Sequence, residues 1–124
     1  MNMKCTIVTA VACFGFALPA TALPSTAAGE TSVAQVVDLI QRSSTDTAAR
    51  NAAMAYLAGV GEATGLLIKE AGVRAPDSIT CARPLGISSD AALAALSRTD
   101  KASWKQTAAT PILVNDMMGR AGCR

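Results

Sequence analysis

Apolar residues recur at helical spacing along most of the chain, and the clearest stripe comes first. Ser32 precedes that stripe and Gln35 follows three residues later, which is typical of a capping box at a helix N-terminus. The apolar positions then fall at i, i+3, i+4 and i+7, so they share one face of a helix. The members of the stripe are Val33, Val36, Val37 and Ile40.

The second stretch predicts the longest helix of the chain. Thr45 or Asp46 provides its N-cap, and the pattern continues to about Ala71, where Gly72 is the expected stop signal. One side of this helix is predicted to be buried, and it carries Ala49, Ala53, Tyr56, Leu57, Val60, Thr64 and Leu67.

Three glycines interrupt the interior of this long helix. Gly59, Gly61 and Gly65 each cost about 1 kcal/mol of helix stability relative to alanine. We expect compensation from another helix or loop that packs closely against this small-residue surface. The alternative is an alanine-rich helix that tolerates its glycines or bends at them.

Two shorter helices complete the pattern. Ser88 or Ser89 caps the third, and the fourth covers about 105–120 with Pro111 in or near its first turn. The predicted inward-facing residues are Leu93, Leu96, Ile112, Leu113 and Met117. No stretch alternates convincingly at the period of a strand. The sequence therefore predicts an all-α fold, a small bundle of four or five helices.

The first 22 residues have the organisation of a secretory signal peptide. Lys4 supplies the positive charge, residues 6–18 are apolar, and Ala20-Thr21-Ala22 is a small-x-small cleavage site. Alternatives are cleavage after Ala28 or a lipoprotein modified at Cys13. The apolar run is shorter than the roughly 20 residues of a membrane span. We therefore predict a periplasmic protein with a signal peptide (1–22), a flexible mature N-terminus (23–30) and a helical domain (31–124).

Removal of the leader changes both charge and cysteine content. The mature chain keeps 10 basic and 9 acidic residues, so its near-neutral charge favours neither nucleic acid nor an anionic membrane. Cys81 and Cys123 are then the only cysteines, in a compartment where disulfides persist. We predict that they form one structural disulfide worth roughly 4 kcal/mol. A reactive thiol and an intermolecular bridge are the alternatives.

No combination of residues indicates a catalytic or metal site. The chain has no histidine, which is the usual base for serine or cysteine nucleophiles and the commonest metal ligand. No cofactor-binding motif is present, so we predict a non-enzymatic protein without a cofactor or metal. Glu62 on the glycine-rich helix is either a buried acid or, as we favour, part of a solvated face.

Binding is the remaining function, and Trp104 is the most conspicuous candidate. It is the single tryptophan and lies in a polar stretch, so it is either an interface anchor or an ordinary core residue covering one end of the bundle. We favour the core interpretation. A basic rim around it could be formed by Arg83, Arg98, Lys101 and Lys105, for which a solvated surface is the default.

Three segments in sequence resemble a known family. The order "AAMAYLAGVGEA", "CARPLGIS" and a terminal helix ending in "RAGC" resembles the Rap/Tai family of type VI secretion immunity proteins over residues 33–124. The resemblance assigns Cys81 and Cys123 to the family disulfide. It assigns structural roles to Tyr56 and Gly59 of the long helix and to Pro84 of the loop.

The resemblance implies a periplasmic protein that sterically blocks a cell-wall amidase effector, often as a homodimer. The binding element would lie in loops 83–90 or 98–105, where the candidate contact residues are Ser88, Asp90, Asp100, Lys101 and Trp104. The rival functions are a periplasmic acid-stress chaperone and a helical adaptor of the cell envelope. Nine acidic residues against ten basic ones give little support to a chaperone switched on by protonation.

Overall fold

The computed structural model describes residues 25–75 and 78–124 as four α-helices and one short 3-10 turn. The helices are α1 (Val33–Arg42), α2 (Thr47–Arg74), α3 (Ser89–Leu96) and α4 (Ala109–Ala121), with the 3-10 turn η1 (Lys101–Ser103) between the last two. The predicted all-α fold is therefore confirmed, and the described residues contain no strand, only two isolated bridges. The predicted signal peptide lies outside the described residues.

Helix α1 forms as its sequence predicts. The Ser32 side chain accepts a hydrogen bond from the backbone N–H of Gln35, and the Gln35 side chain accepts one from the backbone N–H of Ser32. This reciprocal capping box satisfies two N–H groups that a helix N-terminus leaves unpaired. All four residues of the apolar stripe are buried. Before the helix, residues 26–30 close a turn in which Gly29 donates to the carbonyl of Thr26.

Helix α2 is capped by Asp46, which accepts from the backbone N–H groups of Ala48 and Ala49. The helix is longer than predicted, because Gly72 lies within its last turn and Ala75 is the C-cap. A lone glycine only weakens a helix, so it marks a stop only when the chain also turns there. The prediction for Leu67 was wrong, since its side chain is 69% exposed.

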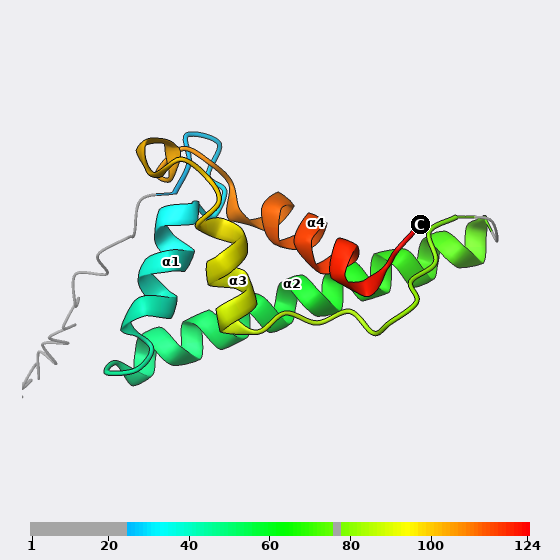
Figure 1. The fold of residues 1–124 in the computed structure, drawn as a ribbon, viewed down its shortest axis with the longest axis horizontal. Coiled ribbons are helices and arrows are strands. Elements are labelled where there is room, and N and C mark those ends of the chain that lie inside the picture. Colours follow the sequence, from blue (N-terminus) through cyan, green and yellow to red (C-terminus); the bar gives the residue numbers. More distant parts are fainter. Residues whose placement is uncertain (1–24, 76–77) are drawn as a thin grey trace, which may run out of the picture.

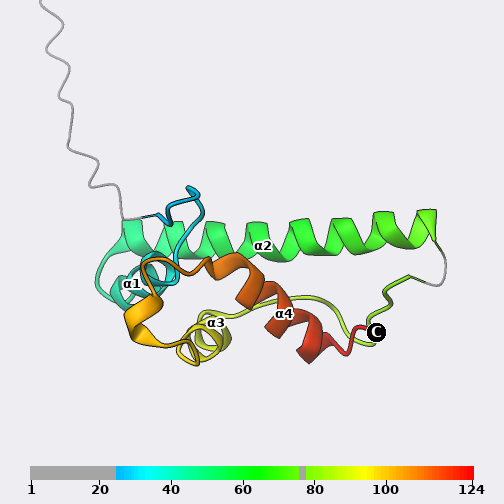
Figure 2. The same cartoon turned by 90° about the horizontal axis from the view of Figure 1, so that it is seen from above.

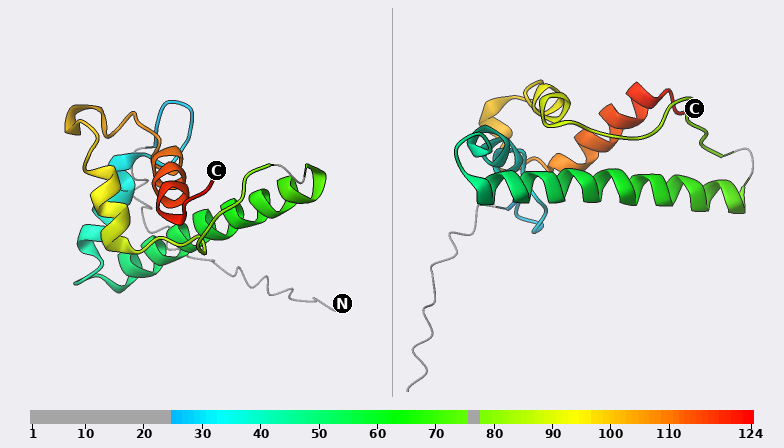
Figure 3. Two further views of the ribbon diagram at one scale, coloured as in Figure 1. Left: turned by 45° about the vertical axis from the view of Figure 1, so that its right-hand side comes forward. Right: turned by 90° about the horizontal axis from the view of Figure 1, so that it is seen from below.

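The other helices all pack on one side of α2 (Figures 1 and 2). At 1.5 Å per residue, α2 is about 42 Å long, whereas α1 and α3 are only about 15 and 12 Å. These two cover the first half of α2, and α4 with the chain after residue 78 runs along the second half (Figures 1 and 3). The second half of α2 is therefore only partly covered, which explains the exposure of Leu67.

The hydrophobic core lies where all four helices meet. Leu96, Leu113 and Met117 are its largest fully buried side chains, together with Val33 and Val36 of α1. Burying a side chain of this size contributes roughly 1.5–3 kcal/mol. Helix α4 starts four residues later than predicted, because residues 101–107 form η1 and the turns that follow it.

The expected close packing against the glycines of α2 is absent among the described residues. A methyl group placed on Gly59 or Gly61 meets no atom within 4 Å, and one on Gly65 reaches only the Cδ1 atom of Leu85, at 4.0 Å. For packing within one chain the prediction was wrong, because the neighbouring helices do not reach these positions; packing against a second copy of the chain stays a prediction. Over residues 25–75 and 78–124, no close packing compensates the helix-weakening effect of Gly59 and Gly61.

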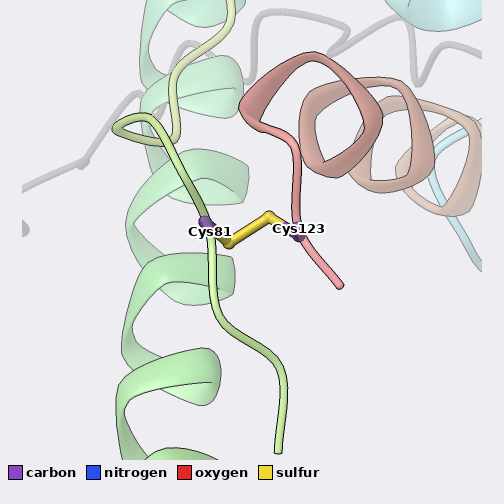
Figure 4. Close-up of a disulfide and its surroundings, with 2 residues drawn as sticks. All are labelled: Cys81 and Cys123. Atoms are coloured by element: carbon purple, nitrogen blue, oxygen red, sulfur yellow. A yellow bond between two sulfur atoms is a disulfide. The ribbon is translucent and has the colours of Figure 1, made fainter.

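The predicted disulfide joins Cys81 to Cys123, 42 residues apart (Figure 4). Thr80 and Arg124 exchange backbone hydrogen bonds of 2.9 Å beside it, and the backbone N–H of Arg83 donates to the carbonyl of Ala121. Gly122, with a φ of 66°, ends α4 in the left-handed conformation that glycine favours. The end of the chain is therefore fastened to the segment that follows α2.

Candidate interaction surface

The structure divides the five predicted contact residues between the two ends of α3. Ser88 caps its N-terminus by accepting from the backbone N–H of Ala91 at 3.2 Å, and Asp90 is exposed in its first turn. Asp100 lies beyond the other end, where it caps η1 through the N–H of Ala102. Eight residues of helix, about 12 Å, separate the two groups. The two loops therefore do not form one compact site.

Trp104 occupies the position of a core residue that closes one end of the bundle. Its ring is half-buried and packs against the core, and its Nε1 donates to the carbonyl of Thr99 at 3.0 Å. Its backbone carbonyl accepts from the N–H of Ala34 at the start of α1. The Nζ of Lys101 lies 5.8 Å from the ring centroid, within the range of a cation–π contact. These contacts support the core interpretation of Trp104.

A feature that the sequence did not reveal is an apolar groove between α2 and α4, which we call the α2–α4 groove. It consists of two adjoining hollows of about 400 and 360 Å³ that share Thr64, Leu67 and Val114. The other residues along it are Ala55, Tyr56, Gly59, Val60, Ala63, Ile68, Ala71, Ile79, Thr110 and Met118. None of these residues is charged, so the groove is an apolar strip on the surface.

Tyr56 and Thr110 join the two walls of the groove. Their hydroxyl oxygens are 2.9 Å apart, in a hydrogen bond that connects α2 to the first turn of α4. Burial raises the pKa of the Tyr56 hydroxyl, so the group is neutral and can donate. Because Gly59 has no side chain, nothing protrudes from α2 into the groove at that position beside Tyr56.

Several large apolar side chains are exposed on and near the groove. Leu67 lines both of its hollows, whereas Leu66 and Val73, which are 59% and 73% exposed on α2, are not among the residues that line it. Ile79 extends the exposed surface onto the next segment. Within the groove, Leu67 and Ile79 line the same hollow, and exposed apolar surface of this kind marks sites of protein–protein contact.

The predicted basic rim does not surround Trp104. Lys101 lies near the ring and Lys105 follows Trp104 in sequence, but Arg98 points to α4, where it forms an ion pair with Asp116. Arg83 follows Cys81 at the opposite end of α4. An i,i+4 pairing of Asp116 with Arg120 could have been read from the sequence, but the contact with Arg98 spans 18 residues.

The described part of the chain contains no group of three or more acidic or cysteine side chains arranged to hold a metal ion. Glu62 is exposed on α2, as favoured from the sequence. None of the helices over 25–75 and 78–124 has the length and apolar character that crossing a bilayer requires. Asp46 and Asp100 cap the N-termini of α2 and η1.

The fold and surface together define a small all-α domain, closed by one disulfide and carrying an exposed apolar groove. No protein-family model matches the chain, and no curated protein or solved structure shows significant similarity to it.

Proposed function

We propose that the protein acts by binding another protein, and that the α2–α4 groove is its main contact surface. The groove itself supports this proposal best, because it is lined without charged residues and leaves Leu67 and Ile79 exposed on a small domain. Covering such a strip removes apolar surface from water and stabilises a complex by roughly 25 cal/mol for each Å² buried.

More specifically, we propose an exported immunity protein that blocks a type VI secreted peptidoglycan amidase. The resemblance of the three sequence segments supports this function. Two residues of the resembling long-helix segment, Tyr56 and Gly59, line the groove, so that segment contributes to the exposed surface. The Cys81–Cys123 disulfide also suits an oxidising compartment such as the periplasm.

A titration tests this proposal directly. The oxidised mature protein is added to the type VI amidase encoded in the same genome while hydrolysis of peptidoglycan crosslinks is followed. We expect inhibition that saturates near one protomer per enzyme. Absence of inhibition at large excess would exclude that enzyme as the partner.

Two adjacent leucines provide a matched pair of variants for the same titration. Leu67 lines the groove and Leu66 does not, although both are exposed on α2. Leu67→Lys should weaken inhibition at least tenfold, because it places a charge that must be desolvated in the contact surface. Leu66→Lys should leave inhibition nearly unchanged, and equal losses from both variants would argue against the groove as the contact surface.

A general chaperone is the second candidate, because an exposed apolar strip also suits the binding of unfolded chains. The two functions differ in selectivity. A chaperone of the acid-stress type suppresses aggregation of many proteins in acid, whereas an inhibitor binds one partner at fixed stoichiometry at neutral pH. Light scattering of several aggregating proteins at acid and neutral pH distinguishes them. An envelope adaptor would bind a partner without inhibiting it.

A second copy of the chain is an alternative occupant of the groove, and the family resemblance implies homodimers. Sedimentation equilibrium of the wild type and of Leu67→Lys decides this. A dimer that dissociates in the variant would place the groove within the homodimer, and the amidase would then have to be bound elsewhere.

A further inference from the structure

The flank of α4 opposite the α2–α4 groove carries a charged cluster of three residues. The Asp116 carboxylate accepts from Arg98, which follows α3, and from the Nε of Arg120 at 2.8 Å. The Nη2 of Arg120 also donates to the carbonyl of Gly86 at 3.2 Å. The Asp116 side chain is only 14% exposed, whereas Arg98 and Arg120 are 69% and 46% exposed. The carboxylate is thus covered by the protein, and the guanidinium groups face solvent.

These residues border a concavity of about 520 Å³ between α3 and α4. Thr99 and Asn115 add a hydroxyl and an amide to its wall, and the remaining lining residues are Ala95, Ile112, Asp116, Gly119 and the two arginines. A smaller hollow of about 310 Å³ adjoins it at Arg120 and brings in Arg83. Three arginines face one aspartate over the two hollows, so the surface is positive although the mature chain is almost neutral.

The cluster fixes the orientation of its arginines. A guanidinium has five N–H donors in a planar fork, and the contacts to Asp116 and Gly86 engage only part of that number on Arg98 and Arg120. The remaining donors belong to side chains that line a surface hollow and are already held in place by these contacts. Less side-chain entropy is then lost when a ligand binds, and a planar fork suits a carboxylate in two-point contact.

We propose that this Arg98–Asp116–Arg120 concavity is a second binding site, which recognises carboxylate side chains in an acidic segment of a protein partner. A polyphosphate or nucleic acid is a poorer match, because Asp116 already neutralises part of the charge and one tryptophan and one tyrosine provide no stacking surface. The inference rests on the proposed function in one respect, namely that the partner is a protein. The proposed second site lies on the flank of α4 that does not line the α2–α4 groove.

Hexaglutamate is a suitable probe, with hexaglutamine and inorganic phosphate as comparisons. We would titrate each into the isotope-labelled, oxidised protein and follow the NMR signals of the arginine Nε–H groups and the Asn115 amide. Saturable shifts of the Arg98, Arg120 and Asn115 signals are expected with hexaglutamate and not with hexaglutamine. Shifts elsewhere, no shifts, or tighter binding of phosphate than of the peptide would overturn the proposal.

Variants separate a shaped site from diffuse charge. Arg98→Gln should weaken hexaglutamate binding about three- to fivefold, as expected for an exposed ion pair. Lys105→Gln removes the same charge from an exposed position outside the concavity and should change affinity less than about twofold. Arg98→Lys should behave like Arg98→Gln if the planar fork matters. Equal weakening by Arg98→Gln and Lys105→Gln would overturn the proposal.

The result is independent of the amidase titration. Leu67→Lys is expected to weaken inhibition and leave the hexaglutamate shifts unchanged, because Leu67 is on α2 and lines the groove rather than the arginine concavity. Loss of inhibition in Leu67→Lys with no hexaglutamate response in the wild type would remove the arginine site and leave the groove proposal intact. Hexaglutamate binding without any amidase inhibition would support the arginine site and remove the amidase as the partner.

Discussion

The glycines of α2 allow a sharp test of how open this helix is. Gly59 and Gly61 lie well inside the helix, with no atom within 4 Å of an added methyl group. Gly59→Ala and Gly61→Ala should therefore each stabilise the protein by about 0.8–1 kcal/mol, the difference in helix propensity between the two residues. For a domain of this size the melting temperature should rise by roughly 4–8 °C per kcal/mol. Thermal unfolding followed by circular dichroism measures the shift.

Gly122 is the matched control, because its glycine is required. Its φ of 66° lies in the left-handed region, so a side chain there is strained even though an added Cβ would make only an ordinary contact with Ala82, at 3.5 Å. Gly122→Ala should destabilise the protein by about 1–2 kcal/mol. If Gly59→Ala and Gly61→Ala also lowered the melting temperature, the conclusion that α2 is uncovered at these two positions would be refuted.

The same pair of variants separates stability from binding. Gly59 lines the α2–α4 groove, and Gly61 does not. Both variants should be more stable than the wild type, but only Gly59→Ala should weaken binding of a partner that approaches the groove closely. Unchanged affinity in Gly59→Ala would mean that the partner does not reach this part of α2.

Three further predictions concern stability. Reduction of the Cys81–Cys123 disulfide should lower the free energy of unfolding by roughly 4 kcal/mol, measured by urea titration with and without reductant. Leu113→Ala should cost about 2–5 kcal/mol in the same assay, because the side chain is fully buried, and a smaller loss would mean that the core collapses around it. Stability should also fall in acid. The pKa of Asp116 is lowered from 3.8, first by its hydrogen bond with Arg120, and the pKa of Asp46 is lowered by backbone N–H groups of α2. Their contribution is present above pH 3.8 and is lost as the pH falls through the folded-state pKa values. Replacing both with asparagine should flatten the dependence on pH below 4.

The sequence predicted those elements that short-range rules control. The capping box at Ser32, the valine stripe of α1 and the N-caps of α2 and α3 depend on residues within one or two turns, and all are observed. Disulfide pairing was predictable because only Cys81 and Cys123 remain after the predicted leader is removed.

The surfaces could not be predicted because they depend on relative helix lengths and long-range contacts. Leu67 has the spacing of a buried residue, and it is exposed because α1 and α3 end before they reach it. The α2–α4 groove arises from residues more than 40 positions apart, such as Leu67 and Val114. Arg98 meets Asp116 only because the chain turns back after α3. In each case the helix itself could be predicted from the sequence, but the packing of the helices decided which of its residues face solvent.

The disulfide also divides the molecule topologically. The chain from Cys81 to Cys123 forms a closed covalent ring that contains α3, η1 and α4, whereas α1 and α2 lie outside it. A protease that cuts once inside the ring opens it without releasing a fragment. A cut in the turn between α1 and α2 instead breaks the only covalent link between α1 and the rest of the protein. Force applied at the C-terminus reaches the segment after α2 through Cys81 and bypasses α4. In single-molecule pulling from the two ends, the segment between Cys81 and Cys123 would therefore extend only after a reductant is added.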